Sequence, residues 1–307
     1  MASKSIYKGK PTLTVFTPTY NRAHTIGLCY NSLLRQTSTD FKWLIIDDGS
    51  SDSTSNLVNN WIVEGKIPIE YHYQENQGMH GAHNTAYRLI NTELNVCIDS
   101  DDYLADNAVE LIIDKWKKEG SDKYAGIIGL DAKFDGTVIG SQFMTRQTTL
   151  SDFYIQGGYG DRKLIYRTSV IKDVPEYPIF EGEKYVGLGY KYQLIDLKYK
   201  MLTMNEILCY VDYQTDGSSM NMYRQYFRNP RGFAFIRKES MKYHPSFKRR
   251  FIESIHYVSS SIICCNSRFI IESPRKLMTI LSLPFGIALY LYLLFQYKRN
   301  KLMNLNT

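Results

Sequence analysis

The sequence predicts an α/β fold, with a mostly parallel, doubly wound sheet followed by a helical C-terminal region. Two observations lead to this prediction. Short β-rich runs alternate with helical patterns through the first hundred residues, and such alternation is typical of parallel sheets covered by helices on both faces. After residue 220 the chain becomes basic and contains long apolar runs. We therefore expect a first domain at 11–220, with a nucleotide-binding half at 11–104 and an acceptor half at 105–220, and a helical region at 221–307.

The alternation consists of four expected strands and four expected helices. The strands are runs of β-branched and aromatic residues, whereas the helices have apolar residues three or four positions apart. The expected strands cover residues 13–17, 43–46, 69–73 and 95–98. The expected helices cover residues 24–36, 52–62 and 81–90, together with a helix whose buried stripe is Val109, Ile112, Ile113 and Trp116.

Polar clusters follow three of these strands. They are TPTY at 17–20, DDGS at 47–50 and DSDD at 99–102. Ligands of doubly wound sheets bind outside the carboxyl ends of the strands. We therefore expect the three clusters to lie side by side and to form the binding site.

The residue types in these clusters indicate a divalent cation. A dinucleotide site would need G-x-G-x-x-G after the first strand, and a P-loop would need G-x-x-x-x-G-K-[ST], but the chain has neither. Asp99 and Asp101 are hard oxygen ligands suited to Mg²⁺ or Mn²⁺, which would bridge to a diphosphate. Asp48 would then be free to accept hydrogen bonds from a base or ribose. The alternative is that these acids belong to ordinary turns and helix caps.

Four motifs in order resemble family 2 glycosyltransferases of the Rossmann-like GT-A fold. They are TVFTPTYNR at 14–22, LIIDDGSSD at 44–52, ENQGMHGAHN at 75–84 and CIDSDDYL at 97–104. The resemblance covers about residues 11–220. It implies a nucleotide-sugar donor and a D-x-D motif that binds a cation and the sugar diphosphate, with Asp99 and Asp101 as the metal ligands.

The resemblance also implies the residues that bind the nucleotide sugar. Two of them depart from common versions of the family motif, because His83 stands where arginine is frequent and Met79 where lysine is frequent. His80 and His83 have the alternative of being helix-surface histidines. The expected binding residues are Thr17, Pro18, Tyr20, Asp48, Asn76, Gly78, His83, Asn84, Asp99, Ser100 and Asp101.

An acidic motif implies the catalytic base. Members of the family invert the anomeric centre in one displacement, which needs a carboxylate to take the proton of the acceptor hydroxyl. The motif FEGEKY at 180–185 matches in part, with Glu183 as first candidate and Glu181 as second. Lys184 replaces the usual second acid, and an exposed glutamate paired with Lys184 is the structural alternative. Residues 213–219 resemble the loop that closes over the donor.

The sequence predicts transfer of one sugar for each acceptor. Processive members carry Q-x-x-R-W, and QYFRN at 225–229 lacks the tryptophan. The chain also offers no set of transmembrane helices that could form a channel.

The C-terminal region is strongly basic. Residues 221–307 contain 15 Lys/Arg and 3 Asp/Glu, so the remaining 22 basic and 28 acidic residues give the first part a net charge of −6. Apolar residues recur at helical spacing from Phe247 to Phe269, and 277–295 carries no charge. The alternatives for 277–295 are an interfacial anchor, a spanning helix and a helix packed on the catalytic domain. Both flanks are basic, which favours an interfacial anchor over a spanning helix. Long apolar runs and the lack of a nucleic-acid-binding motif make a membrane surface the expected partner rather than nucleic acid.

The expected function is an inverting, metal-dependent glycosyltransferase that uses Mn²⁺ or Mg²⁺ and a UDP-hexose or UDP-N-acetylhexosamine. The acceptor would be a lipid-linked saccharide in cell-surface polysaccharide synthesis, at the cytoplasmic face of the plasma membrane. The alternatives are a non-catalytic nucleotide-sugar-binding scaffold and a sugar-phosphate nucleotidyltransferase. Five cysteines without a C-x-x-C pair argue against a disulfide scaffold. The sequence predicts no oligomeric state.

Overall fold

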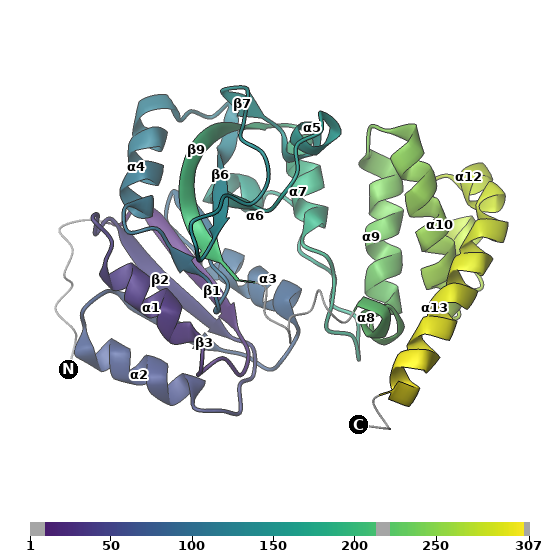
Figure 1. The fold of residues 1–307 in the computed structure, drawn as a ribbon, viewed down its shortest axis with the longest axis horizontal. Helices are drawn as coiled ribbons and strands as arrows, with labels where there is room; N and C mark the ends of the chain where they lie inside the picture. The colour runs from purple at the N-terminus through teal and green to yellow at the C-terminus, as the bar shows by residue number, and fades with distance from the viewer. Residues whose placement is uncertain (1–9, 213–221, 304–307) are drawn as a thin grey trace. The chain divides into compact units, whose positions relative to one another are not determined.

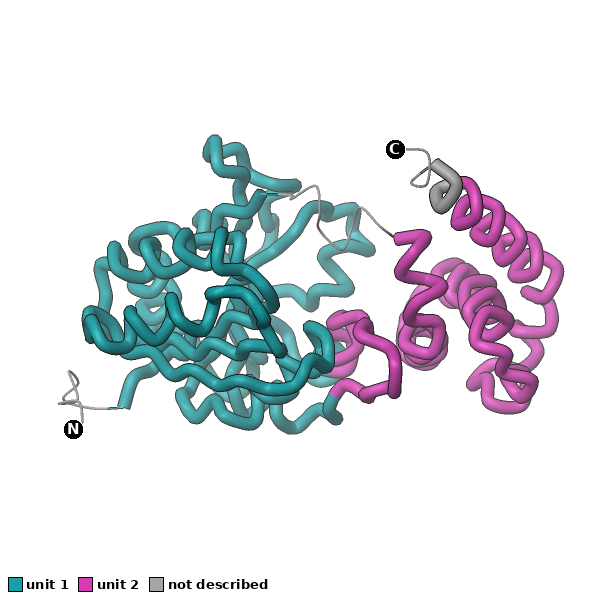
Figure 2. The backbone as a smooth tube through the Cα atoms, turned by 90° about the horizontal axis from the view of Figure 1, so that it is seen from below, with its two compact units in different colours: residues 1–176, 195–212 teal, residues 177–194, 213–307 magenta. Residues whose placement is uncertain are grey.

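The computed structural model describes residues 10–212 and 222–303, with side chains described as far as residue 299 (Figure 1). The chain divides into two compact units, which Figure 2 colours separately. Unit 1 comprises residues 1–176 and 195–212, and unit 2 comprises residues 177–194 and 213–307. Unit 2 therefore includes 177–194 in addition to the C-terminal helices. This segment lay inside the domain that we expected at 11–220.

Unit 1 is built on one mixed sheet, in which the described residues form nine strands in the order β3-β2-β1-β4-β8-β6-β9-β5, with β7 paired to β9. The first four strands in this order pair in parallel, as expected, and β6 also pairs in parallel with β9. Strand β8 is antiparallel to both of its neighbours. The strands are β1 (Leu13–Thr19), β2 (Phe41–Asp47), β3 (Ile69–Tyr73), β4 (Leu94–Cys97), β5 (Tyr103–Leu104), β6 (Tyr124–Lys133), β7 (Gln147–Thr148), β8 (Arg162–Arg167) and β9 (Lys200–Val211).

Helices cover both faces of this sheet, which confirms the expected α/β class (Figure 1). Side chains of α1, α2 and α4 form one core with the inward residues of β1 and β2. On the other face Phe16 of β1 contacts His83 and Tyr87 of α3, edge to face. The helices are α1 (Ile26–Leu34), α2 (Thr54–Glu64), α3 (Met79–Leu89), α4 (Ala108–Glu119), α5 (Leu150–Ile155) and α6 (Thr168–Lys172), and α7 (Gly189–Asp196) runs from unit 2 into unit 1.

An aromatic stack anchors β2 to the helices of the first face. The rings of Tyr30, Trp43 and Trp61 are mutually stacked, and the centroid of Trp61 lies 4.2 Å from that of Tyr30 and 5.9 Å from that of Trp43. Trp43 is fully buried and its Nε1–H donates to Thr17 Oγ1 at 2.9 Å. Stacked aromatic side chains with a satisfied indole N–H contribute both apolar burial and a fixed geometry. This stack therefore sets the position of β1 against β2 just below their carboxyl ends.

Unit 2 is a group of helices in which α10 packs against α9 and also against α13 (Figure 1). Ion pairs support the first of these contacts, since the buried Glu253 of α10 accepts from Arg237 of α9 at 2.8 Å. The helices are α8 (Met222–Arg228), α9 (Pro230–Tyr243), α10 (Phe247–Ile263), α11 (Phe269–Glu272), α12 (Lys276–Leu281) and α13 (Leu283–Met303).

Two C-terminal segments are more interrupted than the apolar spacing suggests. The amphipathic pattern that runs to Phe269 is broken after Ile263, where Cys265 has a φ of +54° and starts a turn. The uncharged stretch 277–295 is divided between α12 and α13 at Ser282, with Pro284 in the first turn of α13. Proline there is tolerated because first-turn amides have no helical partner. Across the described residues no helix has the length and apolar character needed to cross a bilayer.

A glycine sets the close approach of α13 to α10. A Cβ added at Gly286 would lie 2.5 Å from Val258 Cβ and 3.0 Å from Ile255 O. The two helices can therefore pack this closely only because residue 286 has no side chain. Gly27 of α1 is different, since an added Cβ would meet no described atom within 4 Å.

We expect Gly286→Ala to lower the free energy of unfolding by about 1–3 kcal/mol, because the added methyl group overpacks the contact with Val258. Gly27→Ala is the matched control. It should leave stability unchanged or raise it by up to about 1 kcal/mol, since alanine favours helix and the site has room. Urea denaturation followed by circular dichroism measures both variants, and equal stabilities would contradict the packing role.

Candidate active site

The three polar clusters meet at one edge of the sheet. Strand β1 lies between β2 and β4, and all three run in parallel, so their carboxyl ends are neighbours. Beyond the strands, the backbone N–H of Asp48 donates to Thr19 O at 2.8 Å and that of Ile98 donates to Phe16 O at 3.0 Å. The convergence predicted from the sequence is confirmed.

The buried carboxylate of Asp48 holds the next loop against the end of β2. Its Oδ1 accepts from Gln74 Nε2 at 2.7 Å and from Gln77 N at 2.8 Å, and its Oδ2 accepts from Gly78 N at 2.8 Å. Asp48 was expected to be free for a base or ribose. Instead it already accepts three hydrogen bonds within the protein, because the chain must turn sharply from β3 into α3.

Two glycines allow this loop to lie so close to the strand end. Gly49 has a φ of +87°, and a Cβ there would lie 3.0 Å from Asn76 N. Gly78 has a φ of +82° and precedes α3. Asn76 therefore lies directly against the DDGS turn, which agrees with its predicted place at the nucleotide site.

A second set of contacts joins the turn after β1 to the turn after β2. Asn21 has a φ of +53°, and its Oδ1 accepts from the backbone N–H of Ser51 at 2.8 Å. In return Ser50 Oγ accepts from Asn21 N at 2.8 Å, and Asp52 Oδ2 accepts from Ala23 N at 3.1 Å. These hydrogen bonds make the two turns one unit.

The nucleoside residues expected on β1 have different surroundings. Thr17 is fully buried and its hydroxyl accepts from Trp43, so it supports the core. Pro18 is buried, whereas Tyr20 is 51% exposed and available to a ligand. Thr19 was missed from the sequence. It is buried, and its Oγ1 has no hydrogen-bond partner among the described residues.

The α3 residues of the predicted site are buried. His83 is 1% exposed, its Nδ1 lies 2.9 Å from Met79 O, and its ring packs against Phe16 and Tyr87. His80 is equally buried. The alternative of surface histidines is therefore wrong for both. Asn84 is 3% exposed in the same helix.

Carboxylates gather at the end of β4. Asp99 is exposed, Asp101 is half-buried, and Ser100 and Asp102 are buried. Burial above all, and then the charges of Asp99 and Asp101, raise the pKa of Asp102 to about 8, although Lys163 opposes them. Like charges held together in this way favour a bound cation.

One buried cation lies among these acids. Lys163 of β8 reaches to 3.9 Å from Asp131 of β6, with side chains 10% and 4% exposed. The carboxylate of Asp131 and the more distant charges of Asp102 and Asp99 raise the pKa of Lys163 well above its ordinary value, against the effect of burial. A charged lysine therefore balances part of the negative charge behind the D-x-D motif.

The acids at the end of β4 fit a divalent cation shared with a diphosphate. Within the described chain no group of three or more His, Cys, Asp or Glu side chains is arranged to hold a metal. Mg²⁺ and Mn²⁺ sites in phosphate-binding enzymes commonly use one or two carboxylates and take the other ligands from phosphate and water. Asp99 and Asp101 could supply those two carboxylates.

Glu183 is buried in unit 2 at the start of α9. Its Oε1 accepts from Arg231 N and Arg231 Nε, both at 3.0 Å, and its Oε2 accepts from Gly232 N at 2.9 Å. The expected alternative, an exposed glutamate paired with Lys184, is wrong because the partner is Arg231 and the side chain is 6% exposed. Glu181, the second candidate for the base, is exposed, and its backbone carbonyl accepts from Arg231.

Asn229 connects this acidic loop to α8. Its Oδ1 accepts from Lys184 N at 2.7 Å and its Nδ2 donates to Gln225 Oε1 at 2.7 Å. Asn229 is the residue that occupies the tryptophan position of the processive motif. The predicted donor-closing loop at 213–219 lies outside the described residues.

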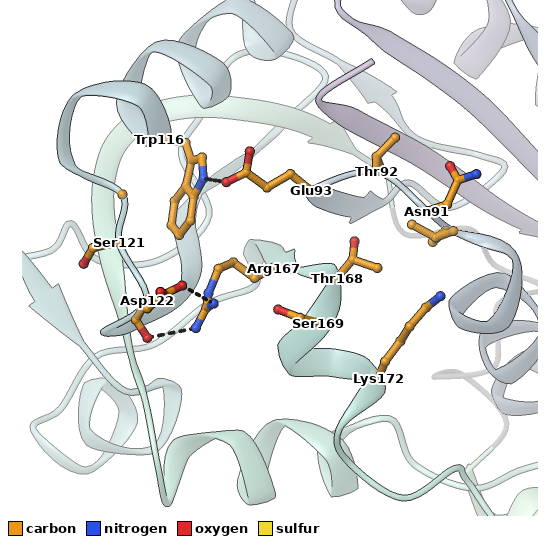
Figure 3. Close-up of a pocket in the computed structure, with 12 residues that line it drawn as sticks. Asn91, Thr92, Glu93, Trp116, Ser121, Asp122, Arg167, Thr168, Ser169 and Lys172 are labelled. Carbon is orange, nitrogen blue, oxygen red and sulfur yellow. Dashed lines mark hydrogen bonds and ion pairs between the residues drawn. The ribbon is translucent and has the colours of Figure 1, made fainter. Parts of the chain in front are cut away.

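A cavity of about 700 Å³ lies at the opposite edge of the sheet, before the amino end of β4 (Figure 3). Two pairs of its polar side chains bond to each other, since Trp116 Nε1 donates to Glu93 and Arg167 donates to Asp122. Ligands of such sheets bind at carboxyl ends. This cavity is therefore not the donor site.

The family model described as "Glycosyl transferase family 2" matches residues 14–169, about half of the chain. The chain belongs to glycosyltransferase family 2. Membership of this family favours sugar transfer over the scaffold and nucleotidyltransferase alternatives.

Curated relatives match this family 2 glycosyltransferase over short segments. Escherichia coli chondroitin synthase is 36% identical over 112 residues, which are 36% of this chain and 16% of the relative. Glycosyltransferase GlyG of Streptococcus pneumoniae is 22% identical over 144 residues, 46% of this chain and 48% of GlyG. The matches thus span well under two thirds of these relatives.

Solved structures match almost the whole chain and confirm the GT-A-like fold with C-terminal helices. S. aureus TarS 1–349 in complex with UDP-GlcNAc has a TM-score of 0.59 at 17% identity, over 94% of this chain and 92% of that one. Mannosyltransferase PcManGT from Pyrobaculum calidifontis, in complex with GDP-Man and Mn²⁺, has a TM-score of 0.55 at 16% identity, over 92% and 74%.

Two of the threonines of β1, Thr17 and Thr19, give a matched test of how this edge of the sheet is built. Thr17→Val should cost about 1–3 kcal/mol of stability, because the buried Trp43 N–H would lose its acceptor. Thr19→Val should cost nothing measurable, since no described residue bonds its hydroxyl. Urea unfolding monitored by tryptophan fluorescence compares the two, and an equal loss in both variants would contradict the assignment.

Proposed function

We propose that this enzyme transfers one sugar, with inversion, from a UDP-hexose or UDP-N-acetylhexosamine to a hydroxyl group of a lipid-linked saccharide. The observation that supports it most directly is the meeting of the DDGS turn and the D-x-D motif beside the end of β1. Such an edge offers a nucleoside surface next to carboxylates suited to a cation. A nucleotide diphosphate sugar needs both.

The donor class is supported by two structural relatives. TarS was solved with UDP-GlcNAc and with UDP, and PcManGT with GDP-Man and Mn²⁺. A UDP-linked sugar is our choice of donor. In this chain Asp48 would act on the nucleoside mainly by holding the loop 74–78, because its carboxylate already accepts three hydrogen bonds. Tyr20 and Asn76 lie at the surface of the same edge and would contact the donor directly.

Asp99 and Asp101 would hold Mn²⁺ or Mg²⁺ together with the diphosphate of the donor. When bound, such an ion supplies Lewis-acid stabilisation of the departing diphosphate. The chain provides few other charges for this task, since Met79 and His83 replace the more frequent lysine and arginine. Asp99 and Asp101 should therefore contribute strongly to the reaction.

Glu183 is our first candidate for the base that takes the proton of the acceptor hydroxyl, and Glu181 is the second. The structure adds a structural role for Glu183, because three donors of Arg231 and Gly232 bind its carboxylate. A base and a helix cap would both require the negative charge of Glu183. Loss of the base would abolish transfer, whereas loss of the cap alone would lower stability and leave transfer in place.

The acceptor and its location are the finer parts of the proposal. A lipid-linked saccharide, used in cell-surface polysaccharide synthesis at the cytoplasmic face of the plasma membrane, is supported by the basic C-terminal region. Names of relatives such as chondroitin synthase agree with polysaccharide acceptors. Transfer of a single sugar is supported by Asn229 at the position of the processive tryptophan.

Asp101→Ala should lower donor turnover by about a hundredfold or more, because one of two cation ligands is lost. The assay measures UDP release from UDP-glucose and UDP-N-acetylglucosamine with Mn²⁺, with Mg²⁺ and with EDTA. Asp114→Ala, an exposed acid of α4, is the matched control and should keep wild-type rates. Equal rates for Asp101→Ala and wild type, or full activity in EDTA, would remove the cation from the proposal.

Glu183→Gln should reduce the transfer rate about 10²–10⁴-fold with little change in donor affinity, if the carboxylate is the base. Arg231→Gln is the comparison, since it removes a partner of the cap and keeps the carboxylate. A lower melting temperature in both variants with transfer retained in Glu183→Gln would show capping alone. The base would then be sought at Glu181, by the same assay on Glu181→Gln.

A further inference from the structure

Helix α13 is apolar around its circumference from Leu283 to Phe295. From Leu283 to Phe295 it carries no charged residue. A helix of this kind is normally buried on all sides, in a protein core or in lipid. The two sides of α13 therefore need separate explanations.

The inner side is covered by other helices of unit 2. Gly286 lies against Val258 of α10, and Leu293 is 4% exposed. Nearer the C-terminus the ring of Tyr297 stacks on Phe227 of α8, with centroids 4.6 Å apart. Contacts at the start, middle and end show that α13 packs against the unit along most of its length.

The outer side consists of large apolar side chains that face solvent. Phe285 is 55% exposed, Leu291 is 56% exposed and Phe295 is 62% exposed. With Ala288 they follow intervals of three, three and four residues, which places them on one face of a helix. This outer face of α13 is a continuous apolar stripe about three turns long.

Neighbouring elements of unit 2 expose apolar side chains as well. In α12, Leu277 is 71% exposed and Leu281 is 59% exposed. In α11, Ile271 is 65% exposed. Soluble proteins seldom leave so many large apolar side chains exposed within about 25 residues unless another surface binds them.

The charged residues that follow α11 in the sequence are all positive. No acidic residue occurs from Ser273 to the end of the chain. Lys276 precedes the apolar stretch, and Lys298 and Arg299 follow it, all three exposed. Lysine and arginine next to an apolar helix face bind anionic lipid headgroups while the apolar side chains enter the acyl boundary.

We propose that unit 2 docks on an anionic lipid bilayer through the outer face of α13, with the helix lying in the plane of the interface. A second copy of this chain is the other possible occupant, but pairing two such faces would bring their basic ends into one interface and repel. Helix α13 would lie parallel to the membrane surface, because its inner side packs on α10 and only its outer face can contact lipid. This inference does not depend on the proposed transfer reaction.

Vesicle co-sedimentation tests the proposal on the full chain. The wild-type protein should bind phosphatidylcholine vesicles that contain phosphatidylglycerol and should bind pure phosphatidylcholine far less, with affinity falling as salt is raised. The double variant Leu291→Gln/Phe295→Gln should bind at least about tenfold more weakly, because two apolar side chains no longer enter the lipid. Lys298→Gln/Arg299→Gln should lose about fivefold for each charge removed.

The control is Val63→Gln/Met144→Gln, which removes two apolar side chains of unit 1 that are 88% and 94% exposed. This variant should bind vesicles like the wild type. Melting temperature and UDP release should be the same in all variants, which separates failure of docking from failure of folding or of the transfer reaction.

Three results would overturn the proposal. The outer-face variant could retain vesicle binding in full, or the wild type could fail to bind vesicles. The third is a dimer in analytical ultracentrifugation that Leu291→Gln/Phe295→Gln converts to monomer, which would identify a second copy as the occupant.

Discussion

The carboxylate of Asp48 is the constraint on which the proposed donor site depends. It receives donors from Gln74, Gln77 and Gly78, and so it fixes the path of the chain between β3 and α3. Without a negative charge at this point, two backbone N–H groups near the end of β2 would lose a buried acceptor, which is costly. Asn76 and the start of α3 owe their positions to this one group. Asp48 thus positions the neighbouring loop residues of the proposed site by its hydrogen bonds.

The acids of β4 depend on a related balance. Asp102 and Asp131 are buried, and the buried Lys163 lies 3.9 Å from Asp131. A lone buried lysine or carboxylate would be strongly unfavourable, whereas an adjacent pair offsets much of the cost. The charges of Asp99 and Asp101 act on the same group, since both raise the pKa of Asp102. A ligand that brings positive charge would relieve this repulsion.

Much of unit 1 could be predicted because its signals are local. The first four strands and helices follow from periodicity, and the convergence of the TPTY, DDGS and DSDD clusters follows from parallel pairing. Strand β8 and its antiparallel pairing with β4 could not be predicted in this way. Pairing between segments far apart in the sequence produces no periodic pattern in the sequence of β4 or of β8. The same reason explains Lys163, which looks like an ordinary strand lysine until β6 and β8 are paired.

The partners of individual side chains were the least predictable features. Thr17 was expected at the nucleoside but bonds Trp43, and Thr19, two residues further on, is the one without a partner in the described chain. The spacing of two places both on one side of β1, so sequence alone cannot distinguish them. Glu183 was the first candidate for the base, with an exposed glutamate paired with Lys184 as the alternative, and Arg231, 48 residues later, is its partner instead. Such contacts depend on how α9 approaches the acidic loop.

The order in which the chain visits the two units limits how the protein can be divided. It leaves unit 1 after residue 176, returns at 195 and leaves again after 212. A shortened form that stops near residue 220 would keep Glu183 but lose Arg231 and Gly232. The carboxylate of Glu183 would then have lost the hydrogen-bond donors that these two residues supply. The C-terminal helices are thus no detachable appendage. Any natural or laboratory recombination of this enzyme would have to exchange residues 177–194 together with them.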